Sequence, residues 1–196
     1  MLYSVSNFRI FCLTLRNVIL TPMLQLLTHI PHQTICVPAK TTLLQEGDIS
    51  TKVFLIKSGC ARLWINTDGK DITLQFFTPG QPVASFDSLL NGTPSKFSLE
   101  TILDTELKIF DKSDIETALN VDANAQRRFL KIAFEIANKY VQLFLSRISN
   151  SPQQRYEQLL KEHPEIVSFI PQHYIASYLG ITAVSLSRIR NRIRKA

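Results

Sequence analysis

Positive charge accumulates at the end of this chain, between Pro171 and Lys195. That segment contains no aspartate or glutamate. Its basic side chains are Arg188, Arg190, Arg192, Arg194 and Lys195. Guanidinium groups donate paired hydrogen bonds to phosphates and to guanine edges, whereas an ordinary surface helix mixes charges of both signs. This unbalanced segment therefore indicates a polyanionic partner.

Two short helices around a glycine are predicted to position these charges. Ile175, Ala176 and Leu179 lie at helical spacing. Gly180 suits the left-handed backbone that ends a helix, and Thr182 is placed to cap the next one. The apolar stripe of the second helix is Leu186, Ile189 and Ile193. Two short helices with a tight turn, the second basic, form the layout of a helix-turn-helix that reads DNA. The alternative is a helical hairpin with a solvated basic face.

The composition describes a folded, basic protein. The chain has 196 residues, of which 45% are hydrophobic, enough for one large or two small packed domains. The net charge of +6 and a pI of about 9.3 again favour a polyanion. Cys12, Cys36 and Cys60 form no CxxC pair. Three scattered thiols suit a reducing cytosol, so we expect a cytoplasmic protein without a disulfide framework.

Residues 1–22 differ from the rest of the chain in their pattern of apolar and charged residues. Their apolar run, Phe8–Leu20, is interrupted by Arg9 and Arg16, which makes it too short and too charged to span a membrane. The start lacks basic residues and no clear small-residue cleavage site follows, which argues against a secretory signal. Our hypothesis is that Met23 is the natural start and that residues 1–22 are an extension.

A run of short strands is predicted in the middle of the chain. β-Branched and aromatic residues recur in short segments separated by turn signals, of which Asp68-Gly69 is the strongest hairpin signal. The segments are Thr34–Val37, Thr42–Gln45, Val53–Lys57, Ala61–Asn66, Ile72–Thr78, Phe97–Ile102 and Glu106–Phe110. This pattern indicates a jelly roll or a small barrel.

Helices are predicted on both sides of these strands. A short amphipathic helix is expected over Met23–His32, and Asp111 with Asp114 is typical of the cap and first turn of another. A long helix follows, and Ser151 with Pro152 then begins a helix that continues through Lys161, ahead of a short connector. The apolar stripe of the long helix is Leu130, Ala133, Phe134, Ala137, Tyr140, Val141, Phe144 and Ile148. We expect this stripe to pair with a second copy, although it could pack on the strands alone.

The order of these parts resembles the Crp/Fnr superfamily of bacterial transcription regulators. Leu44–Asp48 followed by Val53–Gly59 is similar to the family's first hairpins, and Tyr174–Thr182 with Ser185–Arg190 is similar to the branch common in Bacteroidetes. The resemblance implies an α+β fold with a cyclic-nucleotide-binding-like β-roll (a jelly roll) at 23–120. It further implies a dimerisation helix at 121–149 and a helix-turn-helix DNA-binding domain at 150–196.

The sequence departs from the family at the ligand pocket. Members that bind cyclic nucleotides have a Gly-Glu-Leu step and, further on, an Arg-Ser pair that holds the cyclic phosphate. Here Gly-Glu-Leu falls on Ala84, Ser85 and Phe86, and Arg-Ser falls on Ser95 and Lys96. The carboxylate and the guanidinium are both missing, and Lys96 could supply only a point charge. We therefore expect no cAMP binding and leave open whether another small-molecule effector exists.

The resemblance also implies how DNA would be contacted. The base-contacting positions fall on Ala183, Val184 and Arg188, and Ser185 could reach a base or a phosphate. Arg188 suits guanine, whereas Ala183 and Val184 suit a thymine methyl group. The expected phosphate contacts are Thr182, Gln172, His173, Arg192 and Arg190. A homodimer would bind a near-palindrome, and RNA polymerase is one further candidate partner.

No enzyme, metal site or cofactor is expected. The sequence has no nucleophile elbow, P-loop or HExxH motif. Its three cysteines are too few for an Fe–S cluster, and His29, His32, His163 and His173 all lie outside the predicted strands. The competing class is an effector-binding β-roll protein whose basic C-terminal helix binds a partner other than DNA. The effector, the operator and the direction of regulation stay open.

Overall fold

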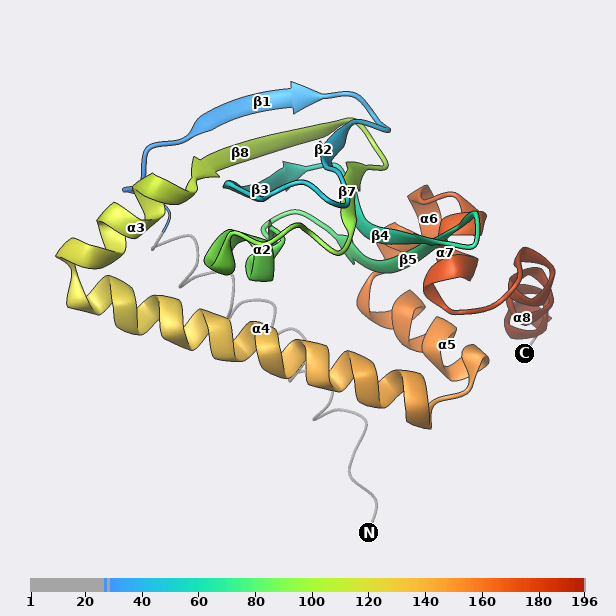
Figure 1. Cartoon of the computed structure of the whole chain (residues 1–196). Helices are drawn as coiled ribbons and strands as arrows, with labels where there is room; N and C mark the ends of the chain where they lie inside the picture. Colours follow the sequence, from blue (N-terminus) through green and yellow to red (C-terminus); the bar gives the residue numbers. More distant parts are fainter. Residues whose placement is uncertain (1–26, 28, 196) are drawn as a thin grey trace, which may run out of the picture.

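The computed structural model describes Leu27 and residues 29–195. The predictions on residues 1–22, and most of the helix predicted at 23–32, lie outside these residues. The described chain forms a β-roll, a long helix beneath it and a group of short helices at its far end (Figure 1).

The β-roll consists of two four-stranded sheets that face each other. One sheet has the order β1 (Gln33–Val37), β8 (Thr105–Asp111), β3 (Lys52–Ser58) and β6 (Pro82–Val83). The other has the order β2 (Thr42–Leu44), β7 (Ser98–Thr101), β4 (Ala61–Thr67) and β5 (Lys70–Phe77). All pairings between neighbouring strands are antiparallel. The space between the sheets is filled by Phe54, Ile56, Ala61, Leu63, Phe77, Val83, Leu99 and Leu107.

The seven predicted strands are confirmed. The turn between β4 and β5 lies at Asp68 and Gly69, which have φ values of 53° and 75°. A two-residue hairpin turn of the type compatible with strand twist requires positive φ at both positions, which is why Asp-Gly predicts it so well. Strand β6 was not predicted, because two residues carry no period and only its pairing with β3 defines it.

Gly59, between β3 and β4, is required by its surroundings as well as by its backbone. Its φ is +86°, and a Cβ atom there would collide with the carbonyl oxygen of Asp104 and with the side chain and backbone of Thr105. The chain passes so close to the turn before β8 that no side chain fits. At this end of the roll, the turn between β3 and β4 lies against the turn between β7 and β8.

Seven helices complete the described chain. They are α2 (Phe86–Asn91), α3 (Lys112–Val121), α4 (Ala123–Ser149), α5 (Pro152–Glu162), α6 (Pro164–Phe169), α7 (Gln172–Tyr178) and α8 (Ala183–Lys195). Helix α4 runs beneath the roll, and α5 to α8 gather beyond its C-terminal end (Figure 1). No helix among the described residues is long and apolar enough to cross a membrane.

Two local predictions need correction: the connector before the helix-turn-helix and the side-chain cap of α3. The connector expected before the helix-turn-helix is itself helical, since Pro164 begins α6 at the position where proline is best tolerated. Helix α2 was not predicted at all. Asp111 does occupy the N-cap position of α3, but its side chain makes no capping hydrogen bond. In contrast, Ser151 caps α5 as predicted, and Gln154 completes a reciprocal capping box.

Candidate functional site

The predicted helix-turn-helix is formed by α7 and α8. Gly180 has a φ of +67°, and the backbone N–H of Ser185 donates to Thr182 Oγ1 at 3.1 Å, so the stop and the cap both lie where the sequence placed them. Ile175, Ala176, Leu179 and Leu186 are buried between the helices. The apolar faces are therefore used internally, and the remaining faces of α8 are available to a partner.

The expected base-contacting residues lie on the first turns of α8. Ala183, Val184 and Arg188 are exposed, and Val184 retains 62% of its accessible surface. Ser185 is different, because its Oγ lies 3.0 Å from Thr182 Oγ1 and thus takes part in the cap. The geometry keeps Arg188 and Val184 free and ties the hydroxyl of Ser185 to the start of the helix.

The expected phosphate contacts lie on both helices of the motif and in the turn between them, where Thr182 is exposed. Gln172 and His173 are exposed in the first turn of α7. Arg192 is also exposed, yet its Nη1 donates to Oε1 of Gln153 on α5 at 3.0 Å, while Arg190 is half-buried. Arg192 consequently helps to seat α8 on α5 in addition to carrying charge, a role that its sequence position did not indicate.

Arg155, a residue that was not predicted to take part in the site, supports the helix-turn-helix from α5. Arg155 on α5 donates from Nη1 to the carbonyl of Asn150 at 2.7 Å and from Nη2 to the carbonyl of Leu179 at 2.8 Å. It thereby links the end of α4 to the turn between α7 and α8. Charge-assisted hydrogen bonds to backbone carbonyls are among the stronger ones, so Arg155 stiffens the support of the candidate reading helix.

The helix-turn-helix shares a hydrophobic core with the roll. Cys60, Phe76 and Ile102 of the roll belong to the same buried cluster as Leu159, Ile166, Ile175 and Leu186 of the C-terminal helices. Burial raises the pKa of the Tyr178 hydroxyl in this region and raises that of the Cys60 thiol to about 12. Both groups are consequently neutral at physiological pH, as a dry interface requires.

The degenerate ligand positions do not form a phosphate clamp. Ala84 and Ser85 are buried, and Ser95 is buried with its Oγ donating to the carbonyl of Phe97 at 2.7 Å. Lys96, the possible substitute charge in the sequence, lies on the surface: its side chain is 84% exposed and its Nζ is 3.8 Å from Asp87 Oδ2. No cation replaces the missing arginine at these positions.

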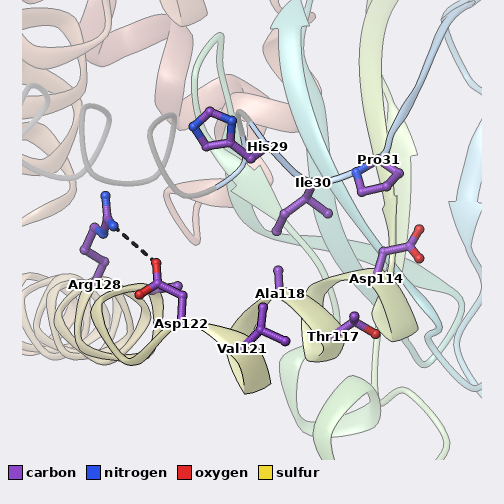
Figure 2. A pocket seen from close by; sticks show the side chains of 10 residues that line it. His29, Ile30, Pro31, Asp114, Thr117, Ala118, Val121, Asp122 and Arg128 are labelled. Carbon is purple, nitrogen blue, oxygen red and sulfur yellow. Dashed lines mark ion pairs between the residues drawn. The ribbon is translucent and has the colours of Figure 1, made fainter.

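A cavity of about 580 Å³ lies away from these positions, between the start of the described chain and helices α3 and α4. Figure 2 shows that the side chain of Ile30 points toward Ala118 across it, with an ion pair between Asp122 and Arg128 at one side. The Nη2 to Oδ2 distance in that pair is 3.6 Å. None of the predicted effector or DNA residues lines this cavity.

The apolar stripe of α4 faces away from the roll. Leu130, Phe134, Val141, Phe144 and Ile148 are all exposed, as is Ala137. The face of α4 that packs on the roll contains Ala125 and Ile132 instead. The alternative in which the roll alone covers the stripe is therefore wrong, and the stripe is free for a second surface.

Within the described residues, no three His, Cys, Asp or Glu side chains are grouped so that they could hold a metal ion.

Comparisons with known proteins agree with this architecture. Residues 34–122 match the family model of the cyclic nucleotide-binding domain. No curated protein sequence matches the chain.

Several solved structures share the fold over most of their length. FixK2 from Bradyrhizobium japonicum is 18% identical, with a TM-score of 0.74 over 85% of this chain and 86% of that one. The c-di-GMP-responsive global regulator CLP of Xanthomonas campestris is 15% identical, with a TM-score of 0.67 over 89% and 91%. A protein described as a Crp/Fnr-family transcriptional regulator, from Eubacterium rectale, is 20% identical, with a TM-score of 0.66 over 87% and 81%. At these identities the likeness establishes the fold.

Proposed function

We propose that this chain, which has the fold of the Crp/Fnr regulators, is a transcription regulator that binds a near-palindromic DNA site as a homodimer. The observation that carries the proposal is the free face of α8, where Arg188, Val184 and Ala183 are exposed on a helix held firmly from behind. A reading helix must present unpaired side chains from a rigid support, and α8 meets both conditions.

Base recognition falls mainly to Arg188 and Val184. The fork of an arginine matches O6 and N7 of guanine, and an exposed valine side chain can pack against a thymine methyl group. Gln172, His173, Arg190 and Arg192 would contact phosphates and set the register on the duplex. Ser185 is better assigned to the helix cap than to a base, because its hydroxyl already faces Thr182.

Dimerisation would place two such helices on one duplex. The exposed stripe on α4 has the period of a paired helix and large side chains such as Phe134 and Phe144 along most of its length. A symmetric pairing through this stripe relates the two α8 helices by a two-fold axis. The operator would then have two half-sites about one helical turn apart.

The roll in this proposal does not respond to cAMP. The positions of the carboxylate and guanidinium are taken by Ser85 and Ser95, which are both buried. The regulator would respond to a different small molecule or to its own abundance. Residues 23–120, 121–149 and 150–196 would serve as roll, dimer helix and DNA-binding domain.

The test is selection of bound sequences from a random duplex pool at physiological salt, with excess competitor DNA. Recovery of a palindromic motif is the expected result. Binding that appears only at low salt, with no motif enriched, would show that the basic helix is not a sequence reader. It would favour the alternative function, a β-roll protein whose basic helix binds a partner other than DNA.

A further inference from the structure

The most deeply buried charge among the described residues belongs to a side chain that the proposed function does not use. Arg62 lies on β4, and its side chain is only 2% exposed. Its Nε donates to Glu100 Oε1 at 2.6 Å, Nη2 to Asp71 Oδ2 at 3.1 Å and Nη1 to Thr73 Oγ1 at 3.2 Å. A cation removed from water to this extent must be held by its partners, since its desolvation would otherwise be costly.

Helix α7 supplies the cover over this arginine. The guanidinium carbon of Arg62 lies 4.1 Å from the centre of the Tyr174 ring and 4.8 Å from that of Trp64. Tyr174 belongs to the first helix of the helix-turn-helix, whereas Arg62, Trp64 and the three hydrogen-bond acceptors belong to the roll. The stacking contact therefore joins the two parts of the molecule.

A second attachment lies one helical turn further along α7. Ser177 Oγ accepts the backbone N–H of Thr73 at 2.9 Å and donates to the carbonyl of Asp71 at 2.9 Å. The rings of Phe76 and Tyr178 lie 5.2 Å apart beside it. Strand β5 and α7 are thus joined by polar and apolar contacts along the length of the short helix.

The same region is tied to α4. Arg147 of α4 donates from Nη2 to the carbonyl of Leu74 at 3.2 Å, and its guanidinium carbon lies 5.3 Å from the centre of the Tyr178 ring. The helix proposed to form the dimer is in this way connected to the strand that holds α7. The orientation of α8 relative to the dimer axis therefore depends on these contacts.

We propose that Arg62, Tyr174 and Ser177 are positioning residues that set the separation of the two reading helices in the dimer. This inference rests on the proposed function, since it assumes two copies of α8 on one duplex. A helix-turn-helix docked at one orientation accepts one spacing of the half-sites. An undocked one follows the DNA and accepts several spacings, while its contacts within each half-site persist.

The experiment varies the spacing of the selected palindrome. Duplexes with the selected spacing, and with one base pair added or removed, are titrated with wild type, Tyr174→Phe and Tyr174→Ala/Ser177→Ala. Tyr174→Phe is the matched control because it retains the ring that covers Arg62. We expect wild type and the control to prefer the selected spacing equally, and the double variant to lose at least about fivefold of that preference. Binding to a single half-site should stay unchanged.

The outcomes separate this inference from the function on which it rests. If wild type selects no motif, the proposed function fails. If wild type selects a palindrome and the double variant retains the full spacing preference, the positioning role is wrong. If the double variant does not fold, Ser177→Ala alone is used in the same titrations. We expect it to lose less of the spacing preference than the double variant, in the same direction. An unchanged preference in that variant would equally overturn the positioning role.

A readout without DNA is provided by Trp64, the single tryptophan of the chain. Its ring and that of Tyr174 touch the same guanidinium, so water that enters on undocking reaches Trp64. We expect red-shifted emission in Tyr174→Ala at an unchanged far-UV circular dichroism spectrum, and wild-type emission in Tyr174→Phe. Wild-type emission in both variants would contradict the docked arrangement.

Discussion

The backbone N–H of Thr73 is satisfied by the hydroxyl of Ser177 at 2.9 Å, across 104 residues of sequence. Thr73 is fully buried on β5. A buried N–H left without a partner costs about 1–3 kcal/mol, so the strand depends on α7 for its own stability. The relationship makes the helix-turn-helix part of the wall of the roll.

Removing the guanidinium of Arg188 should weaken discrimination between bases. We expect Arg188→Ala to lose about 1–3 kcal/mol of preference for the selected site over a site changed at one guanine. Competition titrations with the two duplexes measure this difference. Arg194→Ala is the control, because Arg194 is exposed on the same helix near Asn191, outside the expected reading positions. Equal discrimination by both variants would exclude Arg188 as a reader.

The two roles of Arg192, contact with a phosphate and packing of α8 on α5, can be tested separately. Arg192→Gln should lower the slope of log K against log salt by about one, because one fewer phosphate is neutralised. Gln153→Ala removes the partner of Arg192 and keeps its charge, so the slope should stay at the wild-type value. Binding isotherms at a series of salt concentrations measure both slopes. A wild-type slope in Arg192→Gln would assign that residue to seating alone.

The proposed dimer depends on the stripe of α4. Phe144→Glu should give a monomer, because a carboxylate would face its own copy across an apolar seam. Phe169→Glu is the matched control: both phenylalanines are well exposed, at 63% and 69%, but Phe169 is on α6. Sedimentation equilibrium gives the mass of each variant. A Phe144→Glu protein that remains dimeric would place the contact on another surface.

Wild-type protein should give no heat of binding with cAMP. A cyclic phosphate in a partly dry pocket needs a delocalised cation that donates two hydrogen bonds, and the corresponding position is the buried Ser95. Isothermal titration calorimetry at millimolar nucleotide is the measurement. Micromolar affinity would show that a different residue of the roll carries the phosphate.

Two glycines with similar backbone angles should differ in how well they tolerate substitution by alanine. Gly180→Ala places a Cβ in open space at a φ of +67°, which should cost about 1–2 kcal/mol. Gly59→Ala should cost more than Gly180→Ala, since its Cβ also meets the backbone of Asp104 and Thr105. Urea unfolding monitored by circular dichroism compares the two free energies. Equal losses of unfolding free energy in the two variants would mean that the turn before β8 moves to accommodate the added Cβ at no energetic cost.

The features that could be predicted from sequence are those governed by local chemistry. Asp68 and Gly69 determine a tight hairpin through their own backbone preferences, and the three-four spacing around Val141 determines the stripe of α4. Gly180 and Thr182 likewise define the turn between α7 and α8. In each case the residues that give the signal are the residues that form the feature.

The features that could not be predicted arise from distant contacts. An arginine within a strand is ordinarily exposed, and the burial of Arg62 becomes understandable only once Tyr174 covers it. The role of Arg192 in packing α8 on α5 depends on Gln153, which is distant from it in the sequence. Short elements such as β6 and α2 form because of their contacts with neighbouring elements. They are too short to show a period of hydrophobic residues in the sequence.

The core shared by the roll and the C-terminal helices has a consequence for how the chain is made. Synthesis proceeds from the N-terminus, so the outer face of β4 and β5 is complete while α7 is still inside the ribosome. Until then Phe76 lacks the ring of Tyr178, and Arg62 lacks that of Tyr174. The nascent roll therefore carries an uncovered apolar face late into translation, and any product that stops before α7 keeps that face for chaperones and proteases to recognise.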